Sequence, residues 1–184
     1  MKKNYTNILI AGGLILMMAA ARVVNHEMKM FNFVPMAALG FFAATVIKDK
    51  KYAFLLPVMG QLLADICFAL FTREQGFYGI SQIFTYVALV GATSLGFLVK
   101  KANALNILGG TLAASVVFFL VSNLGYFAQG WNGYSASAFV KTYKDALPFF
   151  RNSLLGDLLG STLLFGGYFL LQRALTGKMA KSKA

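Results

Sequence analysis

Six apolar segments, each close to the length that crosses a bilayer, constrain this chain most strongly. A helix needs roughly 20 predominantly apolar residues to span the hydrocarbon core. With 58% hydrophobic and 12% charged residues over 184 positions, the chain carries more apolar surface than a soluble domain of this size can bury. We therefore expect an all-α integral membrane protein in which residues 1–184 form a single transmembrane domain. The six predicted spans are residues 6–24, 33–49, 52–71, 80–99, 104–127 and 147–173.

The basic residues predict the orientation of these spans. Most of the 17 Lys and Arg residues precede the first span, join the second to the third and the fourth to the fifth, or follow the sixth. By the positive-inside rule both termini are cytoplasmic, as in a multi-pass protein of the bacterial inner (plasma) membrane. A net charge of +11 would suggest nucleic acid in a soluble chain. Its placement here favours the lipid bilayer as partner, with no nucleic acid.

The first segment allows a second interpretation. Lys2 and Lys3, an apolar run and the small residues 19–21 have the shape of a cleavable signal peptide. Cleavage would leave five spans and spoil the even alternation of basic loops. We therefore expect a retained first helix, whose Arg22 reaches the outer interface.

Polar side chains collect towards the outer ends of the predicted helices. At ~1.5 Å per residue, Asp65 lies about 9 Å below the outer end of its helix and Asp157 about 14 Å deep, near the midplane. An ionised residue at mid-bilayer costs at least about 2.5–3.5 kcal/mol and usually faces the interior of a bundle. We expect a funnel open to the outside that is lined by substrate-binding residues, namely Arg22, Asn25, Asn32, Asp65, Arg73, Asn123, Tyr126, Trp131, Tyr134, Arg151, Asn152 and Asp157.

Helical spacing predicts how the two carboxylates are placed. Asp65 shares a helix face with Gln61, and Arg22 on the first helix is its expected partner. Asp157 shares a face with Ser153 and Ser161 but not with Arg151 of its own helix. Buried groups of this kind can also be contacts between helices with no ligand, so a structural role stays open for both carboxylates.

Pro148 predicts the first turn of the sixth helix, where free N–H groups point outwards. Arg151 and Asn152 follow it, and a helix N-terminus favours anions. Together with Arg22 and Arg73, this predicts an electropositive mouth and a ligand with a carboxylate, phosphate or carbonyl edge. The alternative is that Arg151 only reaches lipid headgroups.

The long connection over residues 128–146 is polar, aromatic and plausibly helical in part. Trp131 and Tyr134 on this connection could cover the flat or macrocyclic body of a ligand, as lid loops do. The alternative is an interfacial segment that belongs to an aromatic belt.

Small residues at helical spacing predict close helix packing, with one or two of these faces free to dock another subunit. The pairs are Gly40 and Ala44, Ala88 and Ala92, Gly109 and Ala113, and Gly156 and Gly160.

Several kinds of chemistry are missing from the sequence. One cysteine and one histidine exclude a Cys/His zinc cluster, and no nucleotide-binding motif or HExxH is present. The segment LLGD at 154–157 resembles the GxGD motif of intramembrane aspartyl proteases, but Leu154 replaces the first glycine, and Ala64 precedes Asp65 where tyrosine is expected. We therefore expect no enzymatic activity, no metal and no cofactor.

Four stretches carry a resemblance to an uncharacterised family of six-helix bacterial membrane proteins. They are RVVNHEMKMFNFVPMAALGFFAA, PVMGQLLADI, FFLVSNLGYFAQGWNGYS and YKDALPFFRNSLLGDLL. More distantly, the helix count, size and topology resemble the substrate-binding S components of energy-coupling-factor (ECF) vitamin transporters.

The second resemblance implies a cup of six helices that binds its ligand near the outer face. It also implies a separate coupling subunit with two ATPases, since this chain has no nucleotide site. S components often meet that subunit through an AxxxA-like face on helix one, to which residues 11–13 and 19–21 give no clean match. We expect a membrane protein that binds and takes up a vitamin or related micronutrient; the alternative is a non-transporting scaffold subunit of a membrane complex.

The loop charges make the topology testable. With six spans and cytoplasmic termini, a reporter active only in the cytoplasm should be active when fused after Ala184, and a periplasmic reporter at the same place should be silent. Activity of the periplasmic reporter would contradict the six-span topology.

Overall fold

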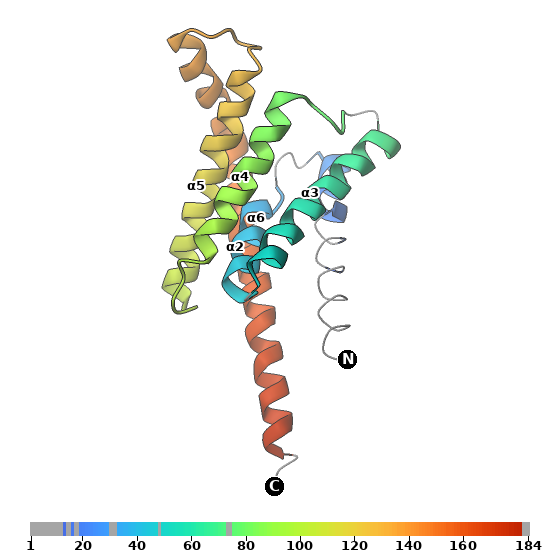
Figure 1. The fold of residues 1–184 in the computed structure, drawn as a ribbon, viewed down its shortest axis with the longest axis vertical. Helices are drawn as coiled ribbons and strands as arrows, with labels where there is room; N and C mark the ends of the chain where they lie inside the picture. Colours follow the sequence, from blue (N-terminus) through green and yellow to red (C-terminus); the bar gives the residue numbers. More distant parts are fainter. Residues whose placement is uncertain are drawn as a thin grey trace.

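A computed structural model describes residues 13, 16, 19–29, 33–47, 49–72 and 75–181, with side chains as far as residue 173. Every regular element in this part of the chain is a helix, which confirms the all-α prediction. Residues 19–27 are helical, and most of the predicted span 6–24 lies outside the described residues. The helices that follow are α2 (Met36–Val46), α3 (Lys50–Phe71), α4 (Ile80–Gly96), α5 (Ala104–Ala128) and α6 (Ala136–Lys181), shown in Figure 1.

Three helices are long and apolar enough to cross a membrane, as expected of a membrane protein. They are α3, α5 and residues 136–173 of α6. The apolar helices α2 and α4 are shorter, so the six full spans stay a prediction. The bounds of α3, α4 and α5 agree with the predicted spans to within about three residues.

Helix α2 lies at the centre of the bundle and contacts α3, α4, α5 and α6 (Figure 1). Every residue from 37 to 44 is buried. This stretch reads AALGFFAA, apolar on all sides, and a helix of that kind is buried on all sides. Its small residues let the neighbouring backbones approach closely.

Helix α2 is shorter than the predicted span 33–49. It begins after Pro35, whose backbone is not helical (φ −78°, ψ 53°), and it ends at Ile47, which is extended. Asp49 then starts α3 by accepting a hydrogen bond from Lys51 N at 2.9 Å. With about 1.5 Å per residue, α2 is about 16 Å long, roughly half of a hydrocarbon core.

Helix α6 is longer than predicted, because it begins at residue 136 and not near Pro148. Ser135 starts it, since Ser135 Oγ accepts a hydrogen bond from Ala138 N at 3.1 Å. Pro148 therefore lies inside the helix, and the predicted first turn at this proline is wrong. Arg151 and Asn152 have helical residues on both sides and no free helix N-terminus beside them. The connection after α5 shrinks to residues 129–135, so the expected partly helical character of 128–146 is confirmed.

Helix α6 contacts α5 at two separate levels. In the first, Tyr143 Oη donates to Leu120 O at 2.7 Å. In the second, Thr111 Oγ1 and Ser161 Oγ are hydrogen-bonded at 2.8 Å. Beyond the second level, the C-terminal part of α6 extends past the ends of the other helices in Figure 1. Between the two levels, α6 lines a space inside the bundle and still contacts α5 through Asp157 and Ser115.

Three of the four predicted small-residue faces pack against neighbouring segments. A Cβ atom added at Gly40 would lie 2.3 Å from Thr93 Oγ1, and one added at Gly160 would lie 2.2 Å from Pro35 Cβ. Ala88 and Ala92 are fully buried. By contrast, Gly109 has no neighbour within 4 Å of such a Cβ atom, so its face is exposed.

The space around two glycines of α6 predicts that the same substitution destabilises the fold at one position and not at the other. Gly160→Ala should destabilise the fold by about 1–3 kcal/mol, because its methyl group overlaps Pro35. Gly167→Ala is the matched control, since nothing lies within 4 Å of the added methyl group there. Thermal unfolding in detergent measures both, and equal melting temperatures would contradict the contact between α6 and Pro35.

Candidate ligand-binding cavity

The Asp157 carboxylate on α6 satisfies the first turn of α2. Ala38 N donates to Asp157 Oδ1 at 2.9 Å, and Ala37 N donates to the same side chain. The remaining first-turn amides bond within the chain, from Met36 N to Val34 O at 2.8 Å and from Leu39 N to Pro35 O at 2.9 Å. Since Pro35 at the N-cap has no N–H, the N–H groups of residues 36–38 are the three without helical partners, and all three are satisfied.

Two glycines bring Asp157 to this position. A Cβ atom added at Gly160 would lie 2.2 Å from Pro35 Cβ, so a side chain there would push α6 away from the start of α2. At Gly156 an added Cβ atom would lie 3.1 Å from Val34 N, which is a tight contact. Ser115 Oγ on α5 donates to Asp157 Oδ2 at 2.7 Å. The expectation that this carboxylate faces polar partners inside the bundle is confirmed.

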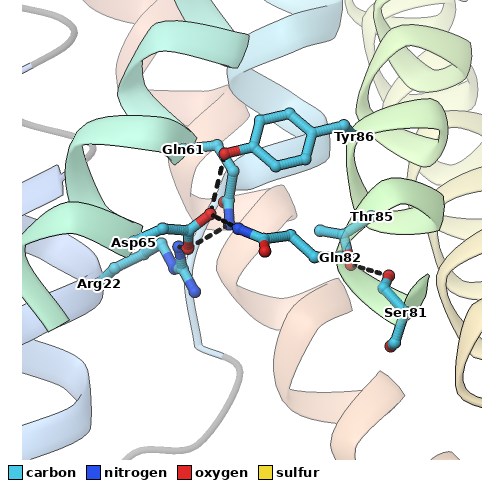
Figure 2. Close-up of polar contacts among 7 residues, drawn as sticks. All are labelled: Arg22, Gln61, Asp65, Ser81, Gln82, Thr85 and Tyr86. Atoms are coloured by element: carbon cyan, nitrogen blue, oxygen red, sulfur yellow. Dashed lines mark hydrogen bonds and ion pairs between the residues drawn. The ribbon is translucent and has the colours of Figure 1, made fainter. Parts of the chain in front are cut away.

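A second buried carboxylate, Asp65 on α3, joins three helices. Arg22 Nη1 donates to Asp65 Oδ1 at 2.6 Å, which confirms the predicted pair. The other donors are Gln61 Nε2 at 2.9 Å, Gln82 Nε2 at 2.8 Å and Tyr86 Oη at 2.9 Å. Figure 2 shows these side chains pointing towards Asp65 from the helical segment 19–27, α3 and α4. Asp65 and Asp157 share no hydrogen-bonding partner among the described residues.

A cavity of about 740 Å³ lies between these two carboxylate networks. Its walls come from residues 22–26, the start of α2, α3, the segment before α4 and its first turns, α5, the turn after α5, and α6. The polar lining residues are Arg22, Asn25, His26, Gln61, Tyr78, Ser81, Thr85, Ser115, Ser122, Asn123, Tyr126, Asn132, Lys141, Thr142, Asp145, Ser153 and Asp157. Phenylalanines 68, 118, 119, 149 and 150 supply apolar surface.

The structure brings together about half of the predicted binding residues. Arg22, Asn25, Asn123, Tyr126 and Asp157 line the cavity. Asp65 lies behind the wall, bonded to two lining side chains, and is fully buried.

Four other predicted residues that the structure describes are not in the wall of the cavity. Trp131 is 59% exposed and packs edge-on against Tyr126, with ring centroids 4.6 Å apart. Tyr134 is 72% exposed, and Arg151 is also exposed. Asn152 is half-buried on α6 outside the lining set. Asn32 and Arg73 lie outside the described residues.

Several lining residues were missing from the predicted site, although helical periodicity could have found them. On α5 they follow a stripe of three- and four-residue steps through Ser115, Phe118, Ser122 and Tyr126. On α6 a similar stripe runs through Thr142, Asp145, Phe149, Ser153 and Asp157. The first part of the second stripe was hidden because the sixth helix was expected to begin at residue 147.

The cations at the cavity are paired. Arg22 bonds Asp65, and its guanidinium lies 5.2 Å from the centre of the Phe68 ring. Lys141 forms an ion pair with Asp145 one turn along α6. Tyr78 lies in the segment before α4. Burial raises the pKa of its phenol, so the side chain presents a neutral hydroxyl group to the cavity. In the part of the chain that the structure describes, no three His, Cys, Asp or Glu side chains converge to hold a metal ion.

The Asp157 contacts make a stability prediction. Asp157→Leu should lower the melting temperature in detergent, although leucine is more apolar, because it leaves the Ala37 and Ala38 amides without an acceptor. Each unsatisfied group costs about 1–3 kcal/mol. Asp157→Asn keeps one acceptor oxygen and should lie between the two. A melting temperature of Asp157→Leu at or above that of the wild type would show that α2 does not depend on this carboxylate.

Comparison with known proteins identifies the family but not an activity. No curated protein and no solved structure matches the chain. The family of unknown function DUF6580 matches residues 2–180, nearly the whole sequence. The chain is therefore a member of the DUF6580 family, as its resemblance to an uncharacterised family suggested.

Proposed function

We propose that this protein binds a small organic molecule in the cavity between the two carboxylate networks and serves in its uptake across the bacterial inner membrane. The observation that carries the proposal is the cavity itself. Its volume of about 740 Å³ falls within the range of roughly 300–1,000 Å³ that is typical of ligand pockets. Its wall combines phenyl rings with a few convergent polar groups, which is the usual composition of such pockets.

The arrangement of side chains around the cavity supports a ligand-binding role over a purely structural one. Protein interiors are packed as densely as organic crystals and contain few empty spaces larger than a water molecule. Here Asp157 and Asp65 hold the surrounding helices, while Asn25, Asn123 and Asn132 face the space between them. Polar side chains around a space of this size suit a site that exchanges water for a ligand.

In the proposed arrangement all six predicted segments cross or enter the membrane, with both termini in the cytoplasm. Asp157 then lies near the midplane, and the cavity opens to the outside through the ends of α5 and α6. The short helix α2 begins inside the bundle, next to the cavity. Discontinuous helices of this kind often border the binding sites of secondary transporters.

Uptake against a gradient needs an energy source, and the sequence contains no nucleotide-binding motif. We include in the proposal a separate coupling subunit with ATPases, of the ECF type. The exposed face of Gly109 and Ala113 on α5 is free to contact such a partner. The same face would serve a non-transporting scaffold, so ligand binding is the property that separates the two functions.

A screen with a matched pair of variants tests the proposal. Ser153 and Thr162 both lie on α6 and donate to the carbonyl four residues earlier, at 3.2 and 2.8 Å, but only Ser153 lines the cavity. Vitamins, corrinoids and nucleobases are screened by thermal shift and by the fluorescence of Trp131, which reports through Tyr126. A ligand should saturate the wild type and Thr162→Phe, and should lose about tenfold or more in affinity in Ser153→Phe, because the added ring occupies the cavity. If no compound behaves in this way, the scaffold function is favoured.

A further inference from the structure

The chemistry of the ligand can be inferred from how the amide side chains around the cavity are oriented, and the inference rests on the proposed binding function. Gln61 is fully buried, and its Nε2 donates to Asp65 Oδ1 at 2.9 Å. An ionised carboxylate only accepts hydrogen bonds, so this contact fixes which end of the amide is which. Gln61 Oε1 is left buried with no partner among the described residues, while the side chain lines the cavity. Buried acceptors are rarely left unpaired, so this oxygen calls for a donor from the ligand or from water.

The three asparagines of the wall are oriented in the same way. The Nδ2 group of Asn25 donates to Phe33 O, and that of Asn123 donates to Phe119 O at 2.8 Å. Backbone carbonyls only accept, so these amides cannot be reversed. Asn132 Nδ2 donates at 3.1 Å to Thr142 Oγ1, whose own proton goes to Ala138 O. In each case the described residues offer no donor to the carbonyl oxygen of the asparagine.

The serine hydroxyl groups add further acceptors. Ser115 donates to Asp157, Ser122 donates to Phe119 O at 3.4 Å, and Ser153 donates to Phe149 O at 3.2 Å. A hydroxyl group has one proton and two lone pairs, so each of these oxygens keeps acceptor capacity towards the cavity.

The charged side chains of the wall also favour a cationic ligand over an anionic one. The Arg22 and Lys141 cations are each paired with a carboxylate. Among the described residues no cation pairs with Asp157, whose carboxylate also lines the cavity. Donors also remain on the wall, namely the other N–H groups of Arg22, the second N–H of each amide and hydroxyl groups such as that of Tyr126. The described wall therefore combines one buried acceptor that has no donor, Gln61 Oε1, with a carboxylate that no cation pairs and with no unpaired Arg or Lys cation.

We propose that the ligand is rich in hydrogen-bond donors and carries a cationic nitrogen, as a protonated amine, an amidine or an amino-substituted heterocycle does. Its N–H groups bond Gln61 Oε1 and the asparagine oxygens, and its apolar or flat part lies against the phenylalanines of the wall. Cationic nitrogens are also attracted to aromatic faces. This replaces the anionic ligand expected from the sequence, which depended on a helix N-terminus at Pro148 that the fold does not contain.

Matched probes of opposite charge test the inference in nanodiscs of phosphatidylcholine, whose headgroup has no N–H donor. Benzamidine is compared with benzoate, and phenethylamine with 3-phenylpropionate, by thermal shift and ligand-observed NMR. The amines should bind and the carboxylates should not. Asn123→Asp adds a negative charge to the wall and should tighten amine binding about five- to tenfold. Asn106→Asp is the matched control, because Asn106 also lies on α5 and donates to a backbone carbonyl, at 2.8 Å, but lies outside the cavity.

The wild-type comparison stands even if a variant unfolds, and melting without ligand identifies such a variant. Carboxylates that bind as well as the amines would overturn the inference and leave the proposed function standing. If neither probe class binds, hits of the broader screen decide: hits with cationic N–H donors support the inference, and hits without them overturn it. A screen with no hit removes the proposed function itself. Amine binding that disappears in phosphatidylethanolamine nanodiscs would support the same chemistry and assign it to a lipid headgroup.

Discussion

The contact between Asp157 and the first turn of α2 is the constraint on which the rest of the structure depends. Helix α2 touches every other helix from α3 to α6, yet it begins inside the bundle, where its first amides need acceptors from other parts of the chain. Pro35 provides no side-chain cap, so the acceptor has to come from elsewhere in the chain. Asp157 supplies it from α6, and the negative charge also suits the positive end of the helix dipole. This contact with the α2 amides explains why the apolar helix α6 carries a carboxylate at Asp157.

The second carboxylate network complements the first by holding the opposite wall. Asp65 receives donors from the helical segment 19–27, from its own helix and from α4, while Asp157 connects α2, α5 and α6. Each network adds hydrogen bonds between helices that also pack through apolar contacts. A space can persist between two such fixed points, because closing it would break bonds on both sides. This accounts for a large polar-lined cavity in a chain of only 184 residues.

The sequence was sufficient to predict the helices, the inward-facing carboxylates and the Arg22–Asp65 pair, since apolar runs and depth along a helix are local properties. It was insufficient for the half-length of α2, because residues 33–49 read as one apolar run and the partner of the broken end lies 119 positions away. The extent of α6 was missed for a different reason. Proline is common at the first turn of helices, so Pro148 outweighed the weaker evidence that Ser135 starts the helix. The expected ligand with a carboxylate, phosphate or carbonyl edge stays a prediction, although one of its supports, the helix start at Pro148, is absent.

The long separation between Ala38 and Asp157 also has a consequence for biogenesis. A membrane protein is synthesised from its N-terminus, so α2 leaves the ribosome well before the last helix does. Until residue 157 has been made and inserted, two amides of α2 have no native acceptor, and the half-helix has to remain hydrated or bonded to something else. Completion of the centre of the bundle therefore waits for its final segment. Translation order makes the last helix the step that locks the core, whichever helices entered the membrane before it.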